Sequence, residues 1–298
     1  MATRQQWVEG ARPRTLPAAT APVMAGIATA WHLLGELGGR HLLLAVLAAV
    51  VALALQVGVN YANDYSDGIR GTDDDRVGPM RLVGSKAATP QAVKRAAFTC
   101  FGVAAVAGLV IVLITQAWWL LAVGVACVLA AWFYTGGKNP YGYLGLGEVF
   151  VFIFFGLVAV CGTHYILTGG LTAEAVVAAV GIGAVACALL VANNLRDIPT
   201  DIEAGKKTLA TRLGEVGTRR FYVALMVVAM LSVVVVAALT SWWALLGLLM
   251  VPTSVQAVQV VTSGATGHGL VPVLKTTGVS ELRMGLGLLA GIALSSLF

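Results

Sequence analysis

The chain alternates long apolar runs with short polar connections. Nine runs have about 20 residues, the length that an α-helix needs to cross the hydrocarbon core of a bilayer. They cover residues 15–35, 41–62, 91–114, 117–136, 147–168, 173–195, 220–239, 242–262 and 277–297. The pattern predicts an all-α, polytopic membrane protein with nine transmembrane helices in one domain over residues 1–298.

Two apolar stretches are too long for one helix, even a tilted one. Residues 98–136 are best divided at Thr115 and Gln116, and residues 221–261 at Thr240. A pair of tryptophans follows each dividing point, where the aromatic belt of a membrane protein lies. Each stretch is therefore predicted to be a tight helical hairpin.

The composition agrees with a membrane protein. Hydrophobic residues make up 58% of the chain, there are 35 glycines, and only 11% of the residues are charged. Soluble domains have about 25% charged residues, so this chain has too little charge for a water-facing surface. This excludes a soluble globular enzyme, a disordered protein and a nucleic-acid-binding protein.

The net charge of +5 is explained by the distribution of basic residues. With a cytoplasmic N-terminus, 18 of the 19 Lys and Arg residues fall in cytoplasmic segments, the last two being Lys275 and Arg283, and Arg40 alone falls outside. The positive-inside rule therefore predicts a cytoplasmic N-terminus and an extracytoplasmic C-terminus in the plasma (cell) membrane. No apolar run precedes Thr15, so a cleavable signal peptide is not expected.

All seven aspartates lie in two predicted cytoplasmic segments, after the second and the sixth span. The helical sets are Asn60, Asp64 and Asp67, spaced i, i+4 and i+7, and Asn193, Asp197 and Asp201, spaced i, i+4 and i+8. Each set shares one face of a helix. Both lie near helix carboxyl ends, where the helix dipole does not favour a carboxylate, so a cation is expected to bind there.

Paired carboxylates on two helices suit Mg²⁺, which is usually held by one or two carboxylates together with substrate phosphates. We therefore predict that Asp64, Asp67, Asp197 and Asp201 are the metal ligands and catalytic residues. Basic residues among the acids suit an anionic diphosphate. These are Arg70, Arg81, Lys138 and Lys206. The alternative is a solvated loop in which Asp and Arg pair with each other, which fits 73–75 best.

A lipid diphosphate explains why such a site stands at the end of an apolar bundle. Its tail can lie among the helices while its head group reaches the charged loops. Metal and basic side chains would neutralise the developing charge of the leaving group. With an allylic prenyl diphosphate, this help allows the C–O bond to ionise to a carbocation that a nucleophile can trap.

The two aspartate-rich motifs resemble those of UbiA-type intramembrane prenyltransferases, and the similarity extends over almost the whole chain. Three stretches resemble the branch that acts in menaquinone synthesis. They are GARPRTLP at 10–17, NDYSD at 63–67 continuing to DRVGPMR at 75–81, and YTGG at 134–137 followed by PYGYLGLGE at 140–148. The resemblance implies Mg²⁺-dependent transfer of a polyprenyl group from polyprenyl diphosphate to 1,4-dihydroxy-2-naphthoate. CO₂ and diphosphate would be lost and a demethylmenaquinone formed.

The resemblance also implies roles for individual residues. The diphosphate and its Mg²⁺ would be bound by the two helical sets, with Asn63 and the four basic residues named above also contacting substrate. Arg196, Tyr134, Arg12 and Arg14 are candidates for holding the acceptor. The family's first motif is usually Asn-x-x-x-Asp-x-x-x-Asp, whereas here position 68 is glycine. Which of Asp67, Asp73 and Asp75 completes the first site therefore stays open.

Other functions are compatible with parts of the pattern. A 4-hydroxybenzoate polyprenyltransferase would share the motifs. A CDP-alcohol phosphotransferase would show one longer acidic signature, which this chain lacks. An ion-coupled transporter would place ionisable residues near the middle of the bilayer, and we expect the middle of these spans to be almost free of charge.

Two further features have two interpretations each. Glu148 is either a base for the acceptor hydroxyl or a carboxylate at a helix start that the dipole favours. The aromatic residues between 150 and 155 either line a tunnel for the prenyl chain or face lipid.

Overall fold

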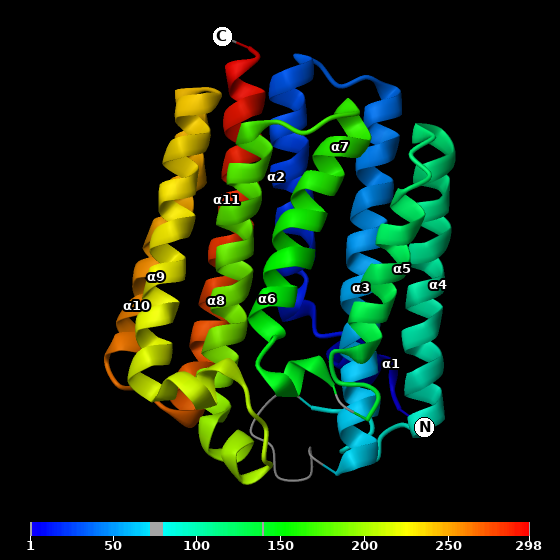
Figure 1. The fold of residues 1–298 in the computed structure, drawn as a ribbon, viewed down its shortest axis with the longest axis vertical. Coiled ribbons are helices and arrows are strands. Elements are labelled where there is room, and N and C mark those ends of the chain that lie inside the picture. The colour runs from blue at the N-terminus through cyan, green and yellow to red at the C-terminus, as the bar shows by residue number, and fades with distance from the viewer. Residues whose placement is uncertain (1, 72–79, 139, 298) are drawn as a thin grey trace.

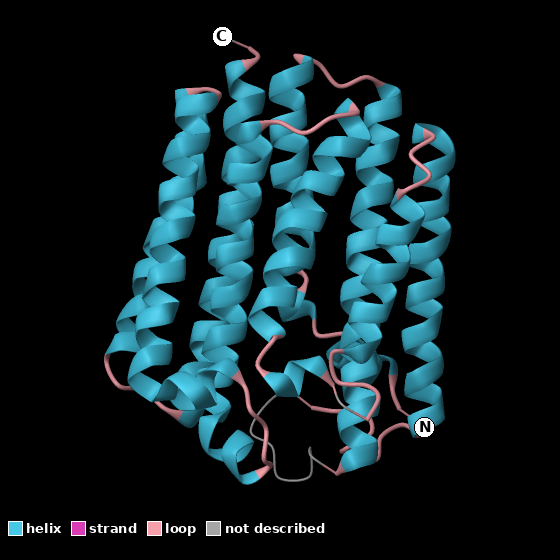
Figure 2. Ribbon diagram, viewed as in Figure 1, coloured by secondary structure: helices cyan, strands magenta, loops and turns pink. Residues whose placement is uncertain are grey.

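The computed structural model describes residues 2–71, 80–138 and 140–297, and within them the chain forms helices and loops without a strand. Figure 1 shows the long helices standing side by side in one bundle, with the N-terminus at one end and the C-terminus at the other. Short connections join them at both ends (Figure 2).

The helices follow the apolar runs of the sequence. In chain order they are α1 (Arg4–Gly10), η1 (Pro13–Thr15), α2 (Pro17–Leu34), α3 (Gly39–Arg70), α4 (Pro90–Thr115), α5 (Leu120–Phe133), η2 (Tyr141–Leu144), α6 (Gly147–Val151), η3 (Phe152–Cys161), α7 (Gly162–Thr168), α8 (Ala173–Glu203), α9 (Leu209–Leu239), η4 (Trp242–Met250), α10 (Val251–Thr262), η5 (Gly267–Leu270) and α11 (Val271–Ser295). The segment η3 is a π-helix, and the other η segments are 3₁₀-helices.

Seven helical rods of the described chain are long and apolar enough to cross a membrane, which makes this a multi-pass helical membrane protein. The consecutive segments from α6 to α7, from η4 to α10 and from η5 to α11 each count as one. The helix α2 is not among the seven, and α5 has only 14 residues, or about 21 Å at 1.5 Å per residue. The predicted count of nine spans is therefore larger than the count that length and composition support.

The two predicted hairpin turns are confirmed. Helix α4 ends at Thr115, and Gln116 caps it in the left-handed region at φ +57°. Helix α9 ends at Leu239, after which the Ser241 side chain accepts a hydrogen bond from the Trp243 amide. In both places a polar residue breaks an apolar run and reverses the chain direction.

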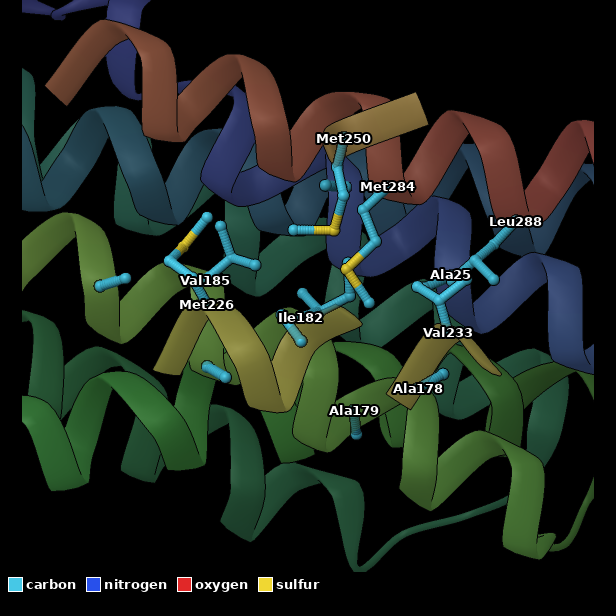
Figure 3. Packing of buried hydrophobic residues seen from close by; sticks show 14 of the residues in the cluster. Ala25, Ala178, Ala179, Ile182, Val185, Met226, Val233, Met250, Met284 and Leu288 are labelled. Carbon is cyan, nitrogen blue, oxygen red and sulfur yellow. The ribbon is translucent and has the colours of Figure 1, made fainter. Parts of the chain in front are cut away.

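Helix α8 is the central helix of the bundle. In its most apolar 18-residue window 72% of the residues are buried, against 28% in α3 and 33% in α4. Figure 3 shows the packing of apolar side chains around it, with Met250, Met284 and Leu288 opposite Ala178 and Ile182.

Glycines allow the closest helix contacts. A Cβ atom on Gly156 of η3 would lie 2.8 Å from the Cα of Gly183 in α8, so these two helices meet backbone to backbone. Such small-residue contacts are typical of membrane bundles.

The interior is not as free of charge as the sequence pattern suggested. Glu281 lies on the buried face of α11 and is fully enclosed. Arg283, which the charge count places in a cytoplasmic connection, lies within the same helix on its exposed face. Both residues lie inside the run predicted as the ninth span, 277–297, so that span carries two charged residues.

Candidate active site

The two aspartate-bearing helices, α3 and α8, both have their carboxyl ends at the end of the bundle where the N-terminus lies (Figure 1). Both motifs are helical over their full length, because α3 continues to Arg70 and α8 to Glu203. The predicted arrangement of each set along one helix is therefore confirmed.

Asp64 of α3 binds the backbone of the loop at 82–83. Its Oδ2 accepts a hydrogen bond of 2.7 Å from the Leu82 amide, and its Oδ1 accepts one of 3.0 Å from the Val83 amide. The side chain is buried. Asp64 therefore shapes the wall of the site by holding the chain at 82–83 against the helix.

Asp67 lies between two polar groups from other segments. Its Oδ1 accepts a hydrogen bond of 2.8 Å from the Tyr143 hydroxyl, and its Oδ2 lies 3.4 Å from Nη2 of Arg81. Both members of the Asp67–Arg81 pair are buried. The ion pair is therefore largely shielded from solvent screening.

The asparagines of α3 hold neighbouring segments. Asn60 donates from Nδ2 to the Ala11 carbonyl and to Oγ1 of Thr15, both at 2.9 Å. Asn63 accepts a hydrogen bond of 2.7 Å from the Thr135 hydroxyl through Oδ1. These two residues, predicted to contact substrate, position the N-terminal segment and the loop after α5.

The second motif is built around one bidentate ion pair. Nε and Nη2 of Arg196 lie 2.6 and 2.7 Å from Oδ1 and Oδ2 of Asp197, and Nη2 also donates to Oδ1 of Asn193 at 2.9 Å. One turn further on, Asp201 pairs with Lys206 at 3.5 Å. The arginine predicted to hold the acceptor is thus paired with an aspartate predicted to hold the metal.

Tyr143 of η2 joins the two motifs. Its hydroxyl donates to Asp67 of the first motif, while its ring lies under two cations, Lys206 Nζ at 4.6 Å and the Arg70 guanidinium at 5.6 Å from the centroid. Burial and the adjacent Asp67 charge raise the pKa of Tyr143, so its hydroxyl stays a donor. Tyr143 therefore lies between Asp67 of the first motif and Lys206, which pairs with Asp201 of the second.

Tyr143 was not singled out from the sequence. It stands in the run 140–148, whose similarity to the menaquinone branch was recognised, but nothing in a lone loop tyrosine indicates contact with two helices. Arg70, beside it, also donates to the carbonyls of Thr135 and Gly137.

The remaining predicted residues lie at the edges of the site. Lys138 is exposed on the loop after α5. Tyr134 meets Tyr141 edge to face with ring centroids 5.5 Å apart, and Tyr141 stacks on Phe150 at 4.0 Å. Phe150 stacks in turn on Phe154 at 6.1 Å. Asp73, Asp74 and Asp75 lie outside the described residues.

Glu148 occupies the first turn of α6, as expected of a carboxylate at a helix start. Its side chain is buried, and Oε1 accepts a hydrogen bond of 2.9 Å from Asn194. Asn194 immediately follows Asn193 of the second motif, so Glu148 is connected to that motif through Asn194.

The donor set of the site fits a hard divalent cation. Its carboxylates and amides offer oxygen ligands, which Mg²⁺ prefers. Among the described residues no three acidic, histidine or cysteine side chains converge on one point. Carboxylates in pairs, rather than a complete cage, agree with a metal that is bound together with substrate phosphates.

Comparisons with known proteins give the family of the chain. The model of the UbiA prenyltransferase family matches residues 19–265. A Mycobacterium tuberculosis protein named 1,4-dihydroxy-2-naphthoate octaprenyltransferase is 51% identical over 297 residues, covering 100% of both chains. An Escherichia coli (strain K12) protein of the same name is 37% identical over 98% of this chain and 96% of its own.

Solved structures show the same fold at low sequence identity. A UbiA homolog from Aeropyrum pernix K1 superposes with a TM-score of 0.69 at 14% identity, covering 93% of this chain and 97% of its own. A homolog from Archaeoglobus fulgidus bound to GPP and Mg²⁺ has a TM-score of 0.64 at 13% identity, with coverages of 95% and 99%. The family match and the full-length relatives together show that this chain belongs to the UbiA prenyltransferase family.

Proposed function

We propose that this protein transfers a polyprenyl group from polyprenyl diphosphate to 1,4-dihydroxy-2-naphthoate, with loss of CO₂ and diphosphate, and forms a demethylmenaquinone. The observation that carries the proposal is the 51% identity over the full length with a protein named for this acceptor. The joined aspartate motifs supply the chemistry that such a transfer needs.

The chain is proposed to cross the plasma membrane nine times, with α2 and α5 as the two additional spans. An odd number of spans agrees with termini at opposite ends of the bundle (Figure 1). The end with the aspartates also carries Arg70, Arg81, Lys206 and Lys207. By the positive-inside rule this end faces the cytoplasm.

We further propose that Asp64, Asp67, Asp197 and Asp201 hold Mg²⁺ together with the diphosphate, as the Archaeoglobus fulgidus structure bound to GPP and Mg²⁺ suggests for the fold. Bound there, the metal would neutralise charge on the leaving diphosphate. Asp64 holds the chain at 82–83 through both of its oxygens, and each oxygen keeps a further lone pair with which it can bind the metal.

The basic residues of the site are placed to exchange partners when substrate enters. Arg81, Arg196 and Lys206 each lie within 3.5 Å of a carboxylate oxygen of Asp67, Asp197 or Asp201. A diphosphate can accept hydrogen bonds from these cations, which frees the carboxylates for a metal. Before substrate arrives, each cation in these pairs neutralises a carboxylate. After substrate arrives, the cations can bind the diphosphate and the carboxylates can bind the metal.

The aromatic row offers a path for the reacting end of the prenyl chain. Tyr134, Tyr141, Phe150 and Phe154 follow one another from the loop after α5 into η3, each in ring contact with the next. Aromatic faces attract cations, so the row can stabilise an allylic carbocation near the aspartates. This favours the tunnel interpretation for Phe150 and Phe154.

The proposal is tested by turnover of polyprenyl diphosphate in membranes or detergent. The assay compares 1,4-dihydroxy-2-naphthoate with 4-hydroxybenzoate, with Mg²⁺ and with excess chelator. We expect Mg²⁺-dependent product and CO₂ from the naphthoate alone. Product from the benzoate alone would show a different acceptor within the same family.

A further inference from the structure

Three buried side-chain oxygens in the described part of the chain have no hydrogen-bond partner. They are Oε1 of Gln56 and both carboxyl oxygens of Glu281. Glu281 is fully enclosed, and Gln56 is 7% exposed. Most buried polar groups are hydrogen-bonded, so each exception calls for an explanation.

The surroundings of Glu281 make its lack of partners unusual. An ionised carboxylate among apolar helices is strongly disfavoured, so the carboxylic acid form is expected there. That form has one donor and further acceptor capacity, and both oxygens are unpaired. Leucine or methionine would fill the same space without this penalty.

Both residues lie next to the junction of η1 and α2. Gln56 donates from Nε2 to Oγ1 of Thr15 at 3.0 Å, and it stands one helical turn further into the bundle than Asn60. On α11, a Cβ atom on Gly278 would lie 3.5 Å from the Arg14 carbonyl oxygen. Glu281 follows Gly278 by one turn on the same face.

Contacts on α8 give the same location. A Cβ atom on Gly278 of α11 would lie 3.7 Å from the Leu189 side chain of α8, and two residues earlier on α8 the Cys187 Sγ donates to the Glu148 carbonyl at 3.1 Å. Glu148 in turn contacts Asn194, beside the second aspartate motif. Glu281 therefore lies deeper in the bundle than the aspartate motifs, toward the middle of the helices.

We propose that Glu281 and Gln56 form an inner polar subsite that binds hydroxyl groups of the aromatic acceptor, an inference that rests on the proposed function. Unpaired oxygens need donors, and a phenolic hydroxyl is a donor that can also accept from the carboxylic acid. A prenyl chain has no such group, so the subsite selects the acceptor rather than the donor.

The decisive variant is Glu281→Leu, which removes the carboxyl and keeps an apolar side chain of similar size. We expect the KM for 1,4-dihydroxy-2-naphthoate to rise about tenfold, as the loss of one such hydrogen bond implies. The KM for polyprenyl diphosphate should stay within about twofold, since that substrate lacks the donors. The thermal midpoint should stay unchanged or rise, because an unpaired buried group is removed.

Two further variants separate binding from packing. Glu281→Gln keeps a donor and an acceptor and should have an acceptor KM between those of the wild type and Glu281→Leu. Met284→Leu changes another fully buried residue of the same face of α11 and should leave both KM values unchanged. A naphthoate that lacks one hydroxyl should bind the wild type more weakly, as a competitive inhibitor, than the dihydroxy compound does. In Glu281→Leu the two compounds should bind with equal affinity.

Several outcomes would overturn the inference. An unchanged acceptor KM in Glu281→Leu would show that the carboxyl does not contact the acceptor. Equal rises of both KM values, or a lower midpoint with the same loss in Met284→Leu, would show a packing effect only. Failure of the wild type to use the naphthoate would instead refute the proposed function, and the variants would then be compared on the acceptor that is used.

Discussion

The contact between Tyr143 and Asp67 gives the sharpest test of the site, because it is the link through which the first motif meets the second. Tyr143→Phe removes the hydroxyl that donates to Asp67 at 2.8 Å and keeps the ring under Lys206 and Arg70. A hydrogen bond to a charged group contributes about 1.5 to 3 kcal/mol. Asp67 would retain the longer contact of 3.4 Å to Arg81.

If this hydrogen bond orients Asp67 for metal and diphosphate, kcat/KM for polyprenyl diphosphate should fall by about 10- to 100-fold. Tyr143→Leu should lose more, because it also removes the ring beneath the two cations, and a cation–π contact contributes about 0.5 to 2 kcal/mol. The KM for the acceptor should change little in Tyr143→Phe.

The matched control is Tyr141→Phe. Tyr141 lies two residues away in the same 3₁₀-helix and donates its hydroxyl at 2.8 Å, but to the neutral Ala130 carbonyl. The assay measures initial rates against polyprenyl diphosphate at saturating acceptor, together with the Mg²⁺ concentration for half-maximal rate. Equal effects of the two Phe variants on kcat/KM would refute the role assigned to Tyr143.

Three other predictions concern the same site and its orientation. Asp64→Asn and Asp197→Asn should each abolish turnover while expression and membrane insertion stay near wild-type levels. A wild-type rate in either variant would contradict the proposed metal site. Because burial and Asp67 raise the pKa of Tyr143 above its usual value of 10, its neutral form persists as pH rises through 10. The rate ratio of wild type to Tyr143→Phe should therefore stay constant up to that pH, and a ratio that declines between pH 9 and 10 would contradict the assignment. In a variant without native cysteines, Ala2→Cys should react with an impermeant thiol reagent only after permeabilisation and Leu297→Cys without it, whereas labelling of both from one side would exclude an odd number of spans.

Local pattern determined much of this fold. The carboxyl ends of α4 and α9 follow from apolar runs interrupted by polar residues at Thr115 and Thr240, because a helix in a bilayer needs about 20 apolar residues, whereas the start of α9 at Leu209 lies before the predicted span 220–239. The helical sets of aspartates could also be predicted, since spacings of i, i+4 and i+7 or i+8 place side chains on one face of the same helix. Family membership could be recognised from these motifs as well.

The tertiary structure decided the contacts between segments far apart in the chain. Tyr143 meets Asp67 because η2 lies between the end of α3 and the loop after α8, and no local pattern in the sequence encodes that approach. Glu281 is enclosed because Gly278 and Gly285 let α11 press against η1 and α2. Sequence periodicity reports which face of a helix is apolar, whereas the partner of each side chain depends on how the helices pack.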